Sequence, residues 1–160
     1  MFTATRLLLL ASAALAFGPP SITVTAVSGK SAPTPGAVFL IRSDHHHDEY
    51  PLTAKARAEG IVNGRRVTQP IALRAVPGKE ATWTATSQWS AGTPWVLVFT
   101  IEQGDHGKYG VAEALVRVAV DGRVLGIEPM RASNERGGSY ARAAEAKEVE
   151  AALASLTRGT

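Results

Sequence analysis

The chain has 160 residues, no cysteine, and a formal net charge of +3 from 17 basic and 14 acidic residues. This length suits one domain of the commonest size, and the lack of cysteine excludes disulfides, thiolate metal ligands and cysteine nucleophiles. Lysine and arginine are spread along the chain rather than clustered, which argues against a nucleic-acid partner.

The first residues follow the pattern of a secretory signal peptide. Arg6 supplies a positive start, residues 7–17 form an apolar run too short to span a bilayer, and Ala14-Leu15-Ala16 matches the small-x-small cleavage rule. Gly18-Pro19-Pro20 would end a helix before it reached spanning length, which disfavours an uncleaved membrane anchor. We therefore predict that residues 1–16 are removed and that the protein is secreted or periplasmic, without membrane insertion after cleavage.

Residues 17–128 show the period-two alternation of a β domain, with turn sequences at short intervals. Asn63-Gly64 and Asp121-Gly122 are each expected to form a two-residue hairpin turn, and Pro70 indicates an edge position or a bulge. The pattern predicts an all-β fold, an immunoglobulin-like antiparallel β-sandwich of about seven to eight strands. The expected strands are residues 21–27, 37–42, 52 to the turn at 63, 67–73, 81–86, 95–101, 111–120 and 123–127.

The most apolar of these strands begins at Trp95, and we expect it to be central. One of its faces carries only large apolar side chains: Trp95, Leu97, Phe99 and Ile101. The segment Gly92-Thr93-Pro94-Trp95-Val96-Leu97 resembles the penultimate core strand of small bacterial periplasmic immunoglobulin-like modules of the YtkA type. This resemblance implies a sandwich fold and implies no activity.

The C-terminal part changes period. Residues 129–140 are rich in glycine, serine and arginine and are expected to form a loop, and residues 141–157 are expected to form a helix. Its apolar stripe consists of Val149, Ala152, Leu153 and Leu156, at spacings of three and four residues. The favoured interpretation is a helix docked on the sandwich, and the alternative is an interaction element for a protein partner.

All four histidines fall in two short polar segments, residues 44–49 and 104–107. Because hairpin-connected strands alternate in direction, every second loop emerges at the same end of a sandwich. Counted from the strand at 37–42, the loops at 44–51, 77–79 and 103–108 are expected at one end. His45, His46, His47, Asp105 and His106 would then share one rim.

This rim suggests a metal site. Neutral imidazole binds zinc and copper(II) well, and a carboxylate can complete the shell. In an extended segment His45 and His47 point to the same side, so the predicted ligands are His45, His47 and His106, with Asp105 or a water molecule in fourth place. The alternative is an ordinary solvated loop whose histidines are incidental.

Enzymatic signatures are missing from the sequence. It contains no G-x-S-x-G motif, no phosphate-binding glycine loop and no H-E-x-x-H motif. We therefore predict a non-enzymatic binding or accessory module that binds zinc or copper(II). The alternatives are a structural or protein-interaction domain and, less favoured, a carbohydrate-binding module that uses Trp89 as a platform.

Overall fold

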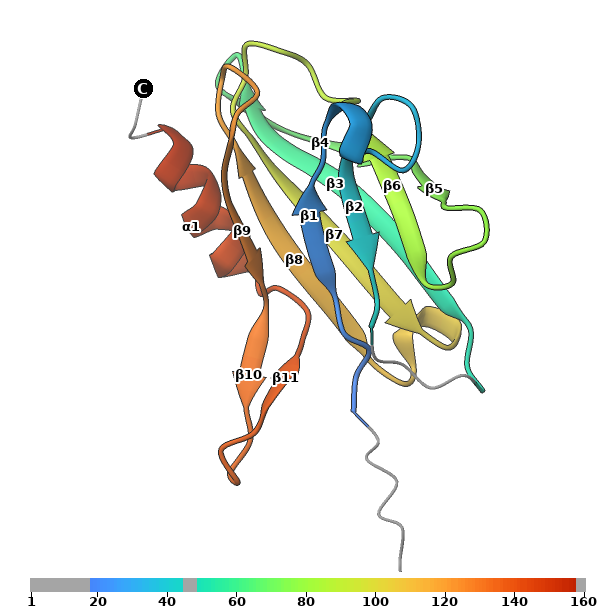
Figure 1. Cartoon of the computed structure of the whole chain (residues 1–160). Helices are drawn as coiled ribbons and strands as arrows, with labels where there is room; N and C mark the ends of the chain where they lie inside the picture. The colour runs from blue at the N-terminus through green and yellow to red at the C-terminus, as the bar shows by residue number, and fades with distance from the viewer. Residues whose placement is uncertain (1–17, 45–48, 158–160) are drawn as a thin grey trace, which may run out of the picture.

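The structure is a computed structural model that describes residues 18–44 and 49–157. Two antiparallel sheets and a C-terminal helix make up its body, and a small hairpin extends from one end (Figure 1). The predicted signal peptide, and with it cleavage after Ala16, lies outside the described residues. The strands are β1 Thr23–Ala26, β2 Ala37–Arg42, β3 Leu52–Val62, β4 Arg65–Ile71, β5 Leu73–Ala75, β6 Thr82–Thr86, β7 Trp95–Gln103, β8 Val111–Val118, β9 Val124–Pro129, β10 Arg131–Ser133 and β11 Ser139–Ala141; the helix is α1 Ala146–Thr157, and η1 Gly29–Ser31 and η2 Asp105–Gly107 are short 3-10 turns.

The sheet order identifies the type of sandwich. One sheet has the order β1-β2-β6-β5 and the other has the order β4-β3-β7-β8-β9. These orders match strands A-B-E-D and C′-C-F-G of an immunoglobulin fold, with β9 added at the edge. The predicted immunoglobulin-like antiparallel β-sandwich with a C-terminal helix is therefore confirmed.

The chain changes sheets at Ala72, where sequence analysis predicted one continuous strand. The side-chain amide of Gln88 accepts a hydrogen bond from the Ala72 N–H and donates one to its carbonyl, both at 2.9 Å. Gln88 thus replaces a strand partner at the crossing. Pro70 precedes this point in β4, an edge strand of the larger sheet, as predicted.

The core lies between the two sheets, as the alternation predicts. Trp95, Leu97, Phe99 and Ile101 of β7 are almost completely buried there.

Both predicted hairpin turns occur, but the second is longer than the two residues expected. Asn63 and Gly64 both have positive φ, whereas between β8 and β9 the Gly122 N–H donates to the Ala119 carbonyl, so that this turn spans residues 119–122.

Helix α1 packs on the outer face of the five-stranded sheet, so the docked interpretation is confirmed. A second apolar cluster joins helix and sheet: Val96, Val98, Leu115, Met130, Val149, Leu153 and Leu156. Within the described residues, no helix is long and apolar enough to cross a membrane.

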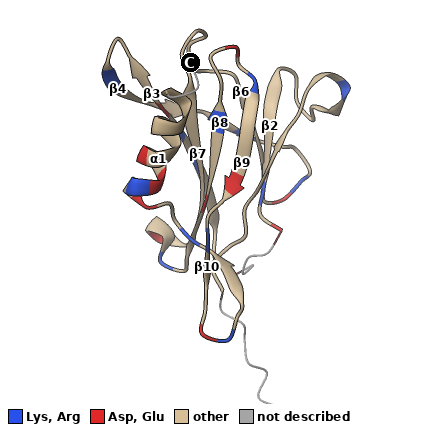
Figure 2. Ribbon diagram, turned by 90° about the vertical axis from the view of Figure 1, so that its left-hand side faces the viewer, with Lys and Arg blue, Asp and Glu red and all other residues tan. Residues whose placement is uncertain are grey.

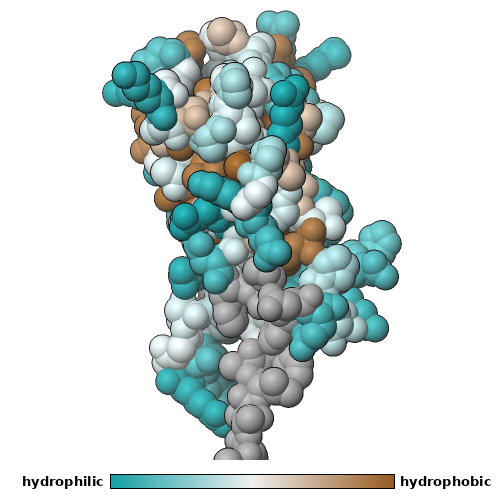
Figure 3. Space-filling view, turned by 45° about the vertical axis from the view of Figure 1, so that its right-hand side comes forward, coloured by the Kyte–Doolittle hydropathy of each residue, from teal (hydrophilic) through white to brown (hydrophobic). Residues whose placement is uncertain are grey.

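The surface of the molecule is mixed in character. Figure 2 shows charged residues scattered over the strands, the helix and the hairpin tip. Figure 3 shows hydrophobic residues in small groups among hydrophilic ones.

The predicted boundaries of the tail are wrong in two respects. Residues 129–140 are not simply a loop, because β10 and β11 pair with each other, and α1 begins at Ala146 rather than at residue 141. Arg142 instead adds to the sheet. Its N–H donates to the Met130 carbonyl at 3.1 Å, and its carbonyl accepts from the Glu113 N–H at 3.0 Å. Tertiary pairing therefore overrides helix propensity in this segment.

Candidate binding site at the loop end

Three loops meet at one end of the sandwich, which we call the loop end. Within the described residues they are 43–44 with 49–51, 76–81 and 104–110. The Ser43 N–H donates to the Ala81 carbonyl at 3.0 Å, and the Gly104 N–H donates to the Pro51 carbonyl at 2.8 Å. The predicted grouping of these loops at one end is therefore confirmed for the described residues.

Glycines give the loop at 104–110 its shape. Gly104, Gly107 and Gly110 all have positive φ, a conformation that most other residues adopt only with strain. A Cβ at Gly104 would lie 2.4 Å from the Tyr109 ring, and a Cβ at Gly110 would lie 2.7 Å from the Pro19 Cα. The Tyr109 ring therefore covers Gly104, and the N-terminal segment packs against Gly110.

Two of the predicted metal ligands, Asp105 and His106, are exposed on this loop. His106 has a φ of 53° and a ψ of 31°, in the left-handed region. The other two, His45 and His47, lie outside the described residues, so the four-ligand set stays a prediction. Among the described residues there is no cluster of three or more histidines, cysteines or carboxylates that could hold a metal ion.

A cavity that sequence analysis missed lies beside this loop. Its volume is about 540 Å³, within the range of small-molecule sites. The chain has three tyrosines, and all of them line this cavity: Tyr50, Tyr109 and Tyr140. They come from the loop before β3, the loop before β8 and the hairpin strand β11, so that three distant segments of sequence build one aromatic site.

Two of the tyrosines form a stacked pair. The ring centroids of Tyr50 and Tyr109 are 3.6 Å apart, with an angle of 19° between the planes. A side-chain hydrogen bond with Tyr109 raises the pKa of Tyr50 above its ordinary value of 10.0, so Tyr50 is neutral at physiological pH. Tyr109 and Tyr140 remain 38% and 41% exposed, which leaves aromatic surface open to a ligand.

The charged residues of the cavity are cations. Lys108 is exposed, with its Nζ 5.4 Å from the Tyr109 ring centroid. Arg142 is already engaged, because Glu148 accepts its hydrogen bonds at 2.5 and 2.7 Å and so raises the pKa of Arg142. None of the described residues that line the cavity is acidic. Lys108 is therefore the cation that a ligand could engage.

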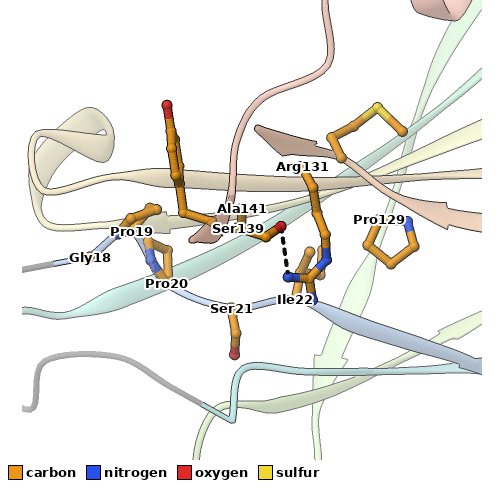
Figure 4. Close-up of a pocket in the computed structure, with 11 residues that line it drawn as sticks. Gly18, Pro19, Pro20, Ser21, Ile22, Pro129, Arg131, Ser139 and Ala141 are labelled. Carbon is orange, nitrogen blue, oxygen red and sulfur yellow. Dashed lines mark hydrogen bonds between the residues drawn. The ribbon is translucent and has the colours of Figure 1, made fainter. Parts of the chain in front are cut away.

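A smaller cavity of about 230 Å³ adjoins the first and shares Gly18, Pro19, Tyr140 and Ala141 with it. Figure 4 shows residues 18–22 on one side and hairpin residues on the other. The Arg131 guanidinium of β10 donates to the Ser139 hydroxyl of β11 at 3.5 Å. The hairpin thus forms one wall of both cavities.

Trp89, the predicted carbohydrate platform, is only partly exposed. It packs against the main core, with its ring centroid 6.1 Å from that of Phe39. This packing gives Trp89 a structural role and makes it a weaker candidate for a carbohydrate platform.

The sequence could have indicated two of the three tyrosines of the cavity, because Tyr50 and Tyr109 lie in or next to two loops that were predicted at the same end. Nothing in the sequence predicted that Tyr140 would join them.

Comparisons with models of protein families, with curated proteins and with solved structures find no match to this chain.

Proposed function

We propose that this protein is an exported, non-enzymatic binding module that binds zinc or copper(II) at its loop end. The proposed ligands are His45, His47 and His106, with Asp105 or water completing the shell. The contact between the two histidine-bearing loops supports this proposal, because the Gly104 N–H donates to the Pro51 carbonyl at 2.8 Å and Tyr109 stacks on Tyr50. Only two residues separate Tyr50 from His47 in the chain, so the chain is short enough to hold His47 near the loop that carries His106.

The exposure of Asp105 and His106 also supports the proposal. Neither residue has an ion pair among the described residues, so metal binding would disrupt no ion pair in that part of the chain. The competing function is a structural or protein-interaction domain with incidental histidines. An interaction role for the helix would depend on an exposed apolar stripe, and the stripe of α1 is buried against the sheet.

The test is a titration of the purified chain with zinc and with copper(II), monitored by calorimetry and by the melting temperature. We expect one metal ion per chain, an affinity that falls as pH drops through about 6.5, and a higher melting temperature with metal. His106→Asn is the informative variant, because asparagine tolerates left-handed backbone and removes the imidazole. His46→Ala is the matched control, since His46 is predicted to point to the other side of the segment.

A large loss of affinity in His106→Asn together with little loss in His46→Ala would support a site shared by the two loops. Equal affinity in the wild type and His106→Asn would contradict it, leaving a histidine tract that binds metal by itself. Asp105→Asn tests the fourth ligand in the same way, because the amide keeps the shape of the side chain and loses the charge.

A further inference from the structure

We infer that the tyrosine cavity is a binding site for an acidic saccharide, a sugar ring that carries a carboxylate. This site is separate from the proposed metal site and does not rest on it. The cavity is lined by Tyr50, Tyr109 and Tyr140, with Lys108 at its edge.

The tyrosines offer the kind of surface that suits a sugar ring. A sugar ring has an apolar C–H face and a rim of hydroxyls, and tyrosine matches both with an aromatic face and a phenolic hydroxyl. Tyr109 and Tyr140 are each more than one third exposed. The site is therefore wet and amphipathic. A purely aromatic ligand would gain more from a dry, enclosed slot.

The shape of the cavity also suits a saccharide. Small residues occupy the cavity walls between the tyrosines: Gly18, Gly110, Ala141 and Ala143. They leave a volume of about 540 Å³ open, enough for more than one sugar ring. The stacked pair of Tyr50 and Tyr109 fixes the loop side of the cavity, and pairing of β10 with β11 fixes the position of Tyr140 on the other side. The aromatic surfaces are thus held in place before a ligand arrives, which reduces the entropy lost on binding.

The charged side chains at the cavity favour an anionic sugar over a neutral one. Glu148 neutralises Arg142, whereas Lys108 has no carboxylate partner among the described residues. The described lining contains no acidic side chain, and the carboxylate whose charge acts on a lining tyrosine is that of Glu49, next to Tyr50 in the chain. A carboxylate on the sugar would therefore meet one available cation, and the cavity should distinguish an acidic sugar from its neutral counterpart.

The test is a titration of the purified chain with trigalacturonate, followed by backbone amide NMR in the presence of a chelator. The matched probe is the fully methyl-esterified trisaccharide, which has the same sugar rings and no charge. We expect saturable shift changes in residues 104–110 and 139–143, and at least fivefold weaker binding of the ester. Because a chelator is present, failure of this test and failure of the proposed metal site can be told apart.

Two variants assign the roles of the lining residues. Lys108→Gln should weaken binding of trigalacturonate about fivefold and leave binding of the ester unchanged, with Lys30→Gln in η1 as the control for charge. Tyr140→Ala should weaken binding of both saccharides about tenfold, with Leu125→Ala on β9 as the control for an exposed apolar side chain. If Tyr140→Ala disturbs the hairpin, Lys108→Gln still tests the site, because it changes only a charge on an exposed loop.

Absence of shift changes at 10 mM trigalacturonate would overturn the inference, as would equal affinity of the wild type and Lys108→Gln for that probe. Saturable binding of 4-hydroxybenzoate in the same cavity with no binding of either saccharide would overturn the assignment to sugars.

Discussion

The helix-covered face of the larger sheet and the loop end use charged residues in opposite ways. Under the edge of α1, Glu59 and Glu113 are buried and fully engaged by hydrogen-bond donors. At the loop end, Lys108, Asp105 and His106 are exposed and have no ion pairs among the described residues. Buried charges must be paired for the fold to be stable, whereas exposed unpaired ones are not needed by the fold and remain available to a ligand.

The pairing on the helix-covered face is extensive. Glu59 accepts hydrogen bonds from Arg57 at 2.9 Å, from Arg66 at 2.8 and 2.9 Å, and from Thr68 at 3.2 Å. Arg66 also pairs with Glu150 of α1, which links the sheet to the helix. Burial opposes ionisation of Glu59, but the hydrogen bonds from the two arginines outweigh it and lower the pKa of that carboxyl. This network satisfies the buried carboxylate of Glu59 and connects the larger sheet to α1.

The largest effect should come from the core that supports both regions. Trp95 is 1% exposed and packs over Gly60, where a Cβ would lie 2.7 Å from the Trp95 ring. Trp95→Ala should lower the free energy of unfolding by about 3–5 kcal/mol, because it removes a large buried ring. Urea unfolding measures this loss. Trp89→Ala is the matched control and should cost less, since Trp89 is only partly buried.

The second prediction tests whether the buried carboxylates are structural. Glu113 accepts hydrogen bonds from the Thr100 hydroxyl and the Ala144 N–H, both at 2.7 Å. Glu113→Ala leaves both donors without their partner and should cost about 2–3 kcal/mol. Glu128→Ala, at an exposed position on β9, should change the free energy of unfolding by less than about 0.5 kcal/mol. Equal effects of the two substitutions would contradict a structural role for the buried Glu113 carboxylate.

The third prediction sharpens the role of the loop glycines. Gly104 has a φ of +70°, and a Cβ there would meet the Tyr109 ring at 2.4 Å. Gly104→Ala should therefore cost about 1–3 kcal/mol and separate Tyr109 from Tyr50. Gly78→Ala is the matched control, since Gly78 has a φ of +71° with nothing within 4 Å of an added Cβ. It should share the backbone strain and leave the stacked pair intact, as tyrosine ring shifts in NMR spectra would show.

The fourth prediction concerns pH. The hydrogen bonds from Arg142 and from the Glu145 N–H lower the pKa of Glu148 from 4.5 to about 2. Because this pKa is lower in the folded state, the ionised form contributes stability that is fully present above about 4.5 and is lost as pH falls towards 2. Urea unfolding between pH 2 and 7 should show this decline, and Glu148→Gln should flatten it. A parallel pH dependence in the variant would contradict the assignment.

The sequence predicted those parts of the fold that local patterns determine. Alternation placed Trp95 and Leu97 in the core, proline at position 70 indicated an edge strand, and the spacing of Val149 and Leu153 indicated a docked helix. The turn at 63 followed from two residues that tolerate positive φ. In each instance the signal lies within a few residues of the feature.

The hairpin and the cavity were missed because neighbouring strands determine them. Strands β10 and β11 have three residues each, too few for a periodic signal. Backbone hydrogen bonds join Arg142 to Met130 and to Glu113, and they keep the segment before α1 extended. Tyr140 lines the same cavity as Tyr50 and Tyr109 because this pairing holds β11 beside the loop at 104–110. The grouping of the loops at one end was therefore predicted, and the tyrosine cavity beside them was not.

The smallest expected effect is the most informative about the loop end. If Lys108 and Tyr140 serve a ligand rather than the fold, Lys108→Gln and Tyr140→Ala should each change the free energy of unfolding by less than about 0.5 kcal/mol. Their exposure supports this expectation, since Tyr140 is 41% exposed and Lys108 extends from an exposed loop. Urea unfolding of both variants beside Glu113→Ala would measure the contrast directly. A loss in Lys108→Gln comparable to that in Glu113→Ala would mean that this cation belongs to the fold.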